Sequence, residues 1–278
     1  MNNTLRTLFR SPKFVIGFTL LLVISTFVIG YPMVNKNDPF EMMGMSYERP
    51  SKEYPLGTDN FGRDVLLELS YGARSSLYVG LIAGIVAISI GLAIGLFAGY
   101  MGGTVDNILT TVNNMFIVIP SFVILILISI SLNNRSSTMV GLIIGFTAWP
   151  WTARAVRAQT SSLRLRDHVN IARISGYGVL RIILLEILPY IASYVFMACI
   201  LQTANGILAE ASISMLGLGP FNTISLGTML NWAIMFEAMG AGAWWAFIPP
   251  AGLIACFTFS LFMMNNGMDE IFNPKIRS

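Results

Sequence analysis

The feature that most restricts the fold is a set of apolar runs, each about twenty residues long, the length that spans a bilayer. The run from Leu77 to Tyr100 contains no Asp, Glu, Lys or Arg. A helix of such residues crosses the hydrocarbon core and satisfies its own backbone hydrogen bonds there. Charged residues make up 11% of the chain, whereas an average soluble domain is about one quarter charged. The sequence therefore predicts an all-α integral membrane protein.

The positions of the apolar runs predict six transmembrane helices. They cover approximately Phe14 to Met33, Leu77 to Tyr100, Ile108 to Leu132, Met139 to Trp151, Ile187 to Leu208 and Ala243 to Met264. The fourth is long enough only if its helix continues through Arg154 and Arg157, whose stems can extend toward the headgroups. The first has a basic flank like that of a signal peptide, but it is long and lacks a small-residue cleavage pattern. We interpret it as a retained anchor.

The distribution of Lys and Arg predicts the orientation, because positively charged loops stay in the cytoplasm. With a cytoplasmic N-terminus, the inner face collects eleven of the seventeen Lys and Arg residues, and the first outer loop carries seven of the fourteen acidic residues. Both termini are therefore expected in the cytoplasm. We expect residues 1–33 to form an N-terminal segment with the first span, 34–74 an extracytoplasmic loop, and 75–278 a core of five spans with a cytoplasmic loop at about 158–182.

The second span contains glycines at near-regular steps, at positions 80, 84, 91, 95 and 99. Small residues about four positions apart let helices approach closely in lipid. The pattern predicts a helix-packing face, and a substrate path along the same glycines is the alternative.

A charged, glycine-punctuated stretch from Asp167 to Tyr190 lies between two apolar runs. The pattern predicts a short helix over about 166–175, which ends near Gly176 and Gly178, and a second helix that begins near Val179. Between two spans, such a helix is exposed for a partner. The single histidine, His168, lies in this stretch and is expected to be solvated.

This stretch resembles the cytoplasmic signature of ABC importer permeases, written E-A-A, three residues, G, nine residues, I-x-L-P. The signature positions are occupied by Asn170, Ile171 and Ala172, then Gly176, then Glu186, Leu188 and Pro189. The spacing is complete, but Asn170, Ile171 and Glu186 depart from the signature. Asn170 replaces the acid that the family offers to the ATPase, and a neutral hydrogen bond is weaker than a charged one.

Three further segments are similar to those of the second permease in the dipeptide, oligopeptide and nickel importer family. They read PLGTDNFGRDVL from Pro55 to Leu66, AGYMGGTVDNIL from Ala98 to Leu109, and ILAEASISMLGLGP from Ile207 to Pro220. The resemblance covers roughly Tyr54 to Arg277 and implies the type I ABC importer permease fold in a prokaryotic cell membrane. The residues that it implies for ATPase coupling are Asp167, Val169, Asn170, Ala172, Arg173, Gly176, Leu188 and Pro189.

The resemblance also implies the partners of the chain, in addition to the lipid bilayer. They are a homologous permease, two cytoplasmic ATPases that hold ATP and Mg²⁺, and an extracytoplasmic substrate-binding protein. No cofactor and no nucleic acid are expected on this chain, and it is not expected to be an enzyme. The compact segment from Gly217 to Ala233 resembles members associated with oligosaccharide uptake, so the cargo could be an oligopeptide or an oligosaccharide, and nickel is a third possibility.

The fifth span contains the main polar cluster within the apolar runs, formed by Gln202, Thr203, Asn205 and Glu210. A carboxylate within the membrane is a functional candidate by default. Gln202, Asn205 and Glu210 are therefore candidates for the translocation pathway. For Glu210, a structural hydrogen-bonding role near the outer headgroups is an equal alternative.

Other chemistries fit the sequence less well. The segment from Gly57 to Asp64 has two glycines at P-loop spacing, but Arg63 and Asp64 replace the Lys and Ser/Thr that bind phosphate and magnesium. Asp59 and Asp64 are expected to form turns and a helix cap rather than a calcium site. Cys199 and Cys256 fall in apolar runs and are expected to be packed as small hydrophobic residues. A secondary transporter remains the alternative function, although it should show several midplane carboxylates and an internal repeat.

Overall fold

The computed structural model describes residues 8–132 and 134–272. The helices in these residues are α2 (Pro12–Val34), α3 (Val65–Met101), α4 (Gly103–Val118), α5 (Ser121–Ser131), α6 (Ser137–Leu163), α7 (Asp167–Ile174), α8 (Val179–Ile182), the π-helical turn η1 (Ile183–Ile187), α9 (Leu188–Met215), α10 (Leu226–Met235), the 3₁₀ turn η2 (Trp244–Ala246) and α11 (Ile248–Phe272). No strand is present in the described ranges. The prediction of an all-α protein is confirmed.

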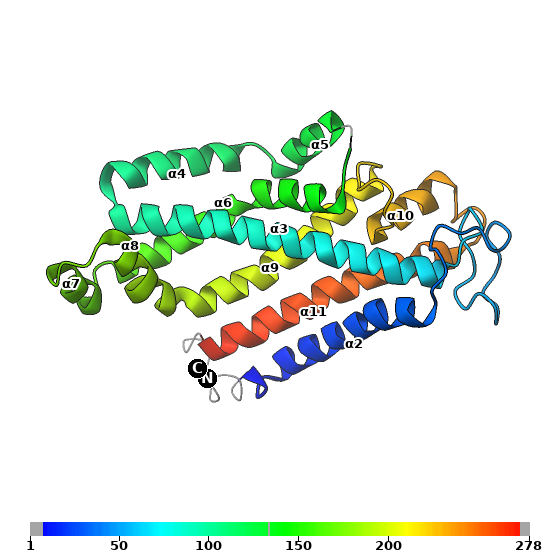
Figure 1. The fold of residues 1–278 in the computed structure, drawn as a ribbon, viewed down its shortest axis with the longest axis horizontal. Coiled ribbons are helices and arrows are strands. Elements are labelled where there is room, and N and C mark those ends of the chain that lie inside the picture. Colours follow the sequence, from blue (N-terminus) through cyan, green and yellow to red (C-terminus); the bar gives the residue numbers. More distant parts are fainter. Residues whose placement is uncertain (1–7, 133, 273–278) are drawn as a thin grey trace.

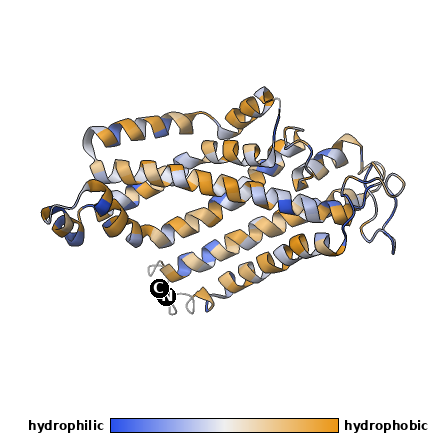
Figure 2. Cartoon of the chain, viewed as in Figure 1, coloured by the Kyte–Doolittle hydropathy of each residue, from blue (hydrophilic) through white to orange (hydrophobic). Residues whose placement is uncertain are grey.

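The long helices run along a common axis, with α3 between two outer groups (Figure 1). On one edge lie α4 and α5, and on the opposite edge lie α2 and α11. The short helix α7 lies at one end of the bundle, which we call the α7 end, and α10 with the loop at residues 35–64 lies at the other, which we call the α10 end. Apolar residues predominate along the long helices between these ends (Figure 2).

The glycines of α3 account for its close contacts with α6 and α9. A Cβ atom on Gly84 would lie 2.6 Å from the hydroxyl of Thr203 on α9, and one on Gly91 would lie 2.6 Å from the Cβ of Thr152 on α6. Real Cβ atoms do not approach so closely, so only glycine allows these backbones to meet. The predicted glycine packing face is confirmed.

Four of the described helical segments are long and apolar enough to cross a membrane, namely 12–34, 65–101, 179–215 and 244–272. A fifth arises if α4 and α5, which bend by 78° at their junction, count as one span. The bend lies at Pro120, which cannot donate a helical hydrogen bond and disfavours helical backbone in the residue before it. The predicted run Ile108 to Leu132 is therefore two helices.

The helix α6 is not among the helices that are long and apolar enough to cross a membrane, because its apolar run is short and is followed by Arg154 and Arg157. It does continue through both arginines to Leu163, as the fourth predicted span required. A six-helix membrane domain and cytoplasmic termini therefore remain predictions.

The helix α3 begins at Val65, well before the predicted second span. The carboxylate of Asp64 caps it by accepting the N–H of Leu66 at 2.9 Å, and Asp59 accepts the N–H groups of Phe61 and Arg63, each at 2.8 Å. Both aspartates therefore form the turn and cap predicted from the sequence. The segment between α2 and α3 spans 35–64, shorter than the expected loop.

Candidate functional site

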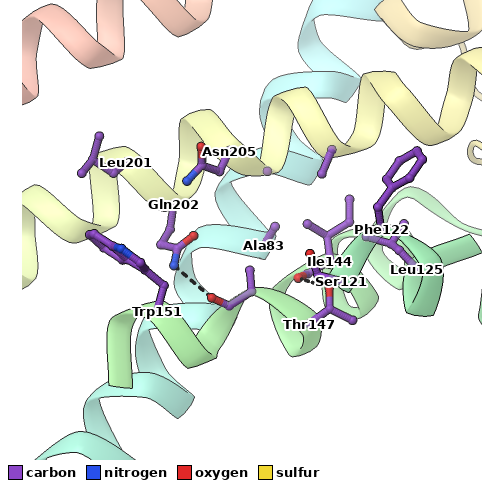
Figure 3. A pocket seen from close by; sticks show the side chains of 13 residues that line it. Ala83, Ser121, Phe122, Leu125, Ile144, Thr147, Trp151, Leu201, Gln202 and Asn205 are labelled. Carbon is purple, nitrogen blue, oxygen red and sulfur yellow. Dashed lines mark hydrogen bonds between the residues drawn. The ribbon is translucent and has the colours of Figure 1, made fainter. Parts of the chain in front are cut away.

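A cavity of about 420 Å³ lies between α3, α5, α6 and α9 (Figure 3). Its wall is mostly apolar, and no charged side chain lines it. The polar side chains on the wall are Ser121, Thr147, Gln202 and Asn205. Two of the three predicted pathway residues, Gln202 and Asn205, thus share one cavity.

The amide of Gln202 is fixed by two hydrogen bonds to α6. Its Nε2 donates to the carbonyl oxygen of Ala148 at 3.1 Å and to the hydroxyl of Thr152 at 2.8 Å. These two bonds join α9 to α6. The amide nitrogen of Gln202 therefore has a structural role, although its side chain forms part of the cavity wall.

The neighbouring Asn205 lies one turn further along α9 and is exposed. Its side chain makes no hydrogen bond to any residue of the described ranges. An amide in an apolar helix keeps hydrogen-bonding capacity that lipid cannot satisfy. Of the two amides on the cavity wall, Asn205 is therefore the one whose side chain is not engaged by another described residue.

The third predicted pathway residue, Glu210, does not line this cavity and is fully buried. Its two carboxylate oxygens accept hydrogen bonds from Ser76 of α3 at 2.7 Å and Ser214 of α9 at 2.6 Å. The Ser76 hydroxyl also accepts the N–H of Leu226, the first residue of α10, at 3.1 Å. Glu210 thus links α3, α9 and α10, a geometry that favours the structural alternative.

The helix α7 has the bounds and the stop that the sequence predicts. It ends in a Schellman motif, in which the N–H of Gly176 donates to the carbonyl of Arg173 and the N–H of Tyr177 to that of Ala172, each at 3.1 Å. Gly176 has φ +80°, in the left-handed region that favours glycine. The second helix, α8, begins at Val179 as expected.

The buried face of α7 consists of Val169 and Ala172, two of the predicted coupling residues. Both are packed with residues of α3, α6, η1 and α9 in one apolar cluster. These two side chains therefore face the chain itself, and their role in ATPase coupling stays a prediction. The apolar side chains that α7 leaves exposed are Ile171 and Ile174, which are 64% and 87% exposed.

The remaining predicted coupling residues lie around this helix. Asp167 and Arg173 are exposed and Asn170 is half-buried, and the guanidinium of Arg173 lies over the ring of Tyr100 at 5.8 Å. Leu188 and Pro189 start α9 directly after η1. Because the Pro189 ring crowds the carbonyl four residues earlier, a widened π turn at this point is physically reasonable.

The expectation of a solvated His168 is wrong. Its ring is half-buried and stacks on Tyr190 of α9, with 4.5 Å between centroids. Sequence spacing does not reveal such a contact between helices.

One ion pair at the α7 end was not anticipated from the sequence. Arg157 of α6 donates from Nη2 to the carboxylate of Asp106 on α4 at 2.7 Å, and its Nε donates to the other carboxylate oxygen. Thr110 donates to the same carboxylate at 3.1 Å. The pair joins α4 to α6, so Arg157 is anchored to a neighbouring helix rather than extended alone toward the headgroups.

Comparisons with known proteins agree with this architecture. Residues 91–278 match the family model described as the binding-protein-dependent transport system inner membrane component. A putative peptide transport system permease protein of Brucella suis is 31% identical over 277 residues, which is 99% of this chain and 92% of the relative.

Two relatives have more specific names. The dipeptide transport system permease protein of Haemophilus influenzae is 30% identical over 94% of this chain and 90% of its own length. The oligopeptide transport system permease protein of Bacillus subtilis is 29% identical over 97% and 88%. The chain therefore belongs to the family of binding-protein-dependent transport system inner membrane components, and it is a permease of the inner membrane.

Proposed function

We propose that this chain is the permease subunit of an ATP-driven importer of short peptides, in which it forms half of the translocation pathway. The observation that carries the proposal beyond the family is α7, a short helix that is packed onto the bundle by one face and presents Ile171 and Ile174 on the other. The relatives named for peptide transport support the cargo class. No catalytic residue is assigned to this chain.

The proposed complex contains a homologous permease, two cytoplasmic ATPases and an extracytoplasmic binding protein. ATP and Mg²⁺ bind the ATPases. The α7 end is cytoplasmic in this arrangement, and both the start of α2 and the end of α11 lie on that side of the bundle (Figure 1). The α10 end then faces the binding protein.

The coupling face in this proposal is the exposed side of α7. Two apolar side chains three positions apart lie on one helix face, as in helices that insert into a groove of a partner. When the ATPases close on ATP, α7 moves with them. Because Val169 is buried against η1 and α9, that movement is passed to the helix that carries Gln202 and Asn205.

The pathway side of the proposal rests on the uncharged cavity. Its amides and hydroxyls can exchange hydrogen bonds with peptide groups of any sequence, and the absence of charge on its lining avoids selection for one sign. Asn205 contacts the passing peptide, whereas Glu210 holds the outer helices together.

The coupling test uses the reconstituted importer and the double variant Ile171→Asp with Ile174→Asp. Two desolvated charges at a helix-in-groove contact should weaken ATPase retention by about thirtyfold or more, because loss of a central contact commonly costs over 2 kcal/mol. The matched control is Met101→Asp, an exposed apolar residue at the same end but outside α7. Normal ATPase retention and normal peptide uptake per ATP in the double variant would exclude α7 as the coupling helix.

The cargo test is a thermal-shift screen of the partner binding protein against short peptides, α-linked and β-linked oligosaccharides, and Ni²⁺. A true ligand raises the melting temperature because it binds only the folded form. Stabilisation by peptides supports the proposal. Stabilisation by an oligosaccharide or Ni²⁺ alone would show that the cargo is not a peptide. The assignment of the chain as a permease would not change.

A further inference from the structure

A second and larger cavity, of about 710 Å³, lies between α2, α3, the start of α6 and the loop at residue 223. Its size falls within the range of small-molecule sites, about 300–1,000 Å³. It is separate from the cavity that contains Asn205, because α3 presents Ala83 to that one and Leu77, Tyr78 and Leu81 to this one. These positions lie on opposite sides of the helix at 3.6 residues per turn.

The wall of this second cavity is apolar along one stretch. It is formed by Val28, Ile29 and Met33 of α2 and by Leu77 and Leu81 of α3. Ile29, Met33 and Leu81 are exposed despite their size. In a membrane protein, such a wall is complementary to an acyl chain.

The lining of the cavity also includes polar residues. It contains Arg74 with the hydroxyl residues Tyr71, Ser75, Tyr78, Ser137 and Thr223. The hydroxyls of Ser75 and Ser137 lie 3.4 Å apart, and the Tyr78 hydroxyl lies 3.1 Å from that of Thr138, so α3 and the start of α6 are tied together here. Ser75, Tyr78 and Ser137 are therefore part of a built contact between α3 and α6.

The side chain of Arg74 is exposed and takes part in no ion pair within residues 8–132 and 134–272. No acidic side chain lines the cavity. Arg74 lies two turns before Leu81 along α3, a separation of about 10 Å at 1.5 Å per residue. Along α3, this positive group thus precedes the apolar lining residues Leu77 and Leu81, and Met33, near the end of α2, lines the same cavity.

We propose that this cavity binds an anionic phospholipid, with its phosphate at Arg74 and an acyl chain against Ile29 and Leu81. A basic side chain near the membrane surface attracts anionic headgroups electrostatically. The proposed function places the start of α3 on the extracytoplasmic side. In that orientation the lipid belongs to the outer leaflet. The lipid site itself does not depend on the cargo or on the ATPases.

The test is native mass spectrometry of the assembled importer with added phosphatidylglycerol or phosphatidylcholine of identical acyl chains. Wild type should retain phosphatidylglycerol in preference to phosphatidylcholine. Arg74→Gln should lower the affinity for phosphatidylglycerol about fivefold, the equivalent of about 1 kcal/mol, and leave phosphatidylcholine unchanged. The matched control, Arg49→Gln, removes an exposed arginine of the loop at residues 35–64 and should change neither.

A second variant, Leu81→Trp, fills the apolar part of the groove and should reduce retention of both lipids. Two results would overturn the proposal. In the first, Arg74→Gln behaves like Arg49→Gln, so that the bound lipid is a general annular one. In the second, the isolated chain retains phosphatidylglycerol but the assembled importer does not, so that the second permease fills the groove. Lipid retention is measured without transport. The lipid-binding result can therefore be interpreted even if the peptide-import proposal fails.

Discussion

The two ends of the bundle are held by different kinds of contact. At the α10 end, the Glu210 carboxylate is fully buried and accepts from two serines, and Glu68, which is 1% exposed, pairs with Arg63 at 3.4 Å. At the α7 end, the ion pairs are partly exposed: Lys13 with Glu270, and Arg157 with Asp106.

The difference matters because the two kinds of contact have different energies. Removal of one member of a buried ion pair such as Glu68–Arg63 commonly costs about 3–5 kcal/mol, and each buried group left without its hydrogen-bond partner costs about 1–3 kcal/mol. An exposed pair contributes about 0–1 kcal/mol. Elements that move are drawn from the less stable parts of a structure. We therefore interpret the α10 end as the fixed end of the permease and the α7 end as the part that can rearrange.

The strongest test of this comparison is Glu210→Ala. The variant leaves the hydroxyls of Ser76 and Ser214 without their buried acceptor and opens a cavity beside α10, so we expect a loss of about 3 kcal/mol in unfolding free energy. Thermal unfolding of the purified importer measures it. The control is Ser212→Ala, an exposed serine on the same helix whose hydroxyl donates only to a backbone carbonyl.

The conservative variant Glu210→Gln separates the two roles considered for this residue. If Glu210 is structural, the yield of assembled importer should fall for every cargo. If uptake of one peptide over another changes while assembly and basal ATPase activity stay normal, Glu210 contacts cargo and the fixed-end interpretation fails.

A second test compares the two faces of α7. Val169→Asp places a charge in the apolar cluster that holds the helix, so α7 should detach, at a cost of about 2 kcal/mol or more. Ile174→Asp alters an exposed residue and should leave the stability of the chain unchanged. Hydrogen exchange of residues 167–174 reports the difference, and equal protection in both variants would contradict the assigned faces.

These faces show what a sequence pattern can and cannot predict. The start, the stop and the capping glycine of α7 follow from local chemistry, and the structure agrees. Apolar residues occur on both sides of this eight-residue helix, at Val169, Ile171, Ala172 and Ile174. Their spacing cannot indicate which side faces the chain and which a partner, because that depends on the placement of η1 and α9.

The candidate pathway shows the same limit. The sequence places Gln202, Asn205 and Glu210 on one predicted span. It does not indicate that the two amides line the cavity while the carboxylate is buried among Ser76, Ser214 and the start of α10. The apolar runs also did not predict the break at Pro120 or the early start of α3 at Val65. A run of apolar residues indicates which part of a helix can lie in lipid, but it does not indicate where the helix begins or breaks. The Asp106–Arg157 pair was missed because its partners lie 51 residues apart in sequence.

That ion pair provides a third and smaller test. Asp106→Asn removes the charge that holds Arg157 and should destabilise α4 by about 1 kcal/mol or less, because the pair is partly exposed. We expect faster hydrogen exchange in residues 103–118 without a measurable change in the melting temperature of the importer. Asn107→Ala, at the next and exposed position, is the control. A large fall in melting temperature would show that the α7 end is as fixed as the α10 end.

The smallest expected effect concerns Asp59 at the α10 end. Burial raises the pKa of this carboxyl above its ordinary value, although the N–H groups of Arg63 and Phe61 and the charge of Arg63 oppose the shift. The folded chain then holds the Asp59 proton to higher pH than the unfolded chain does. The resulting stabilisation is complete below the unfolded pKa of about 3.9 and is lost as the pH rises through the folded pKa.

Asp59→Asn cannot titrate, so its melting temperature should fall less than that of wild type as the pH is raised from about 4 to about 7. The exposed Asp38→Asn is the control and should keep the wild-type slope. Identical slopes for Asp59→Asn and wild type would mean that this carboxyl is solvated in solution, and that the fixed end does not extend into the loop before α3.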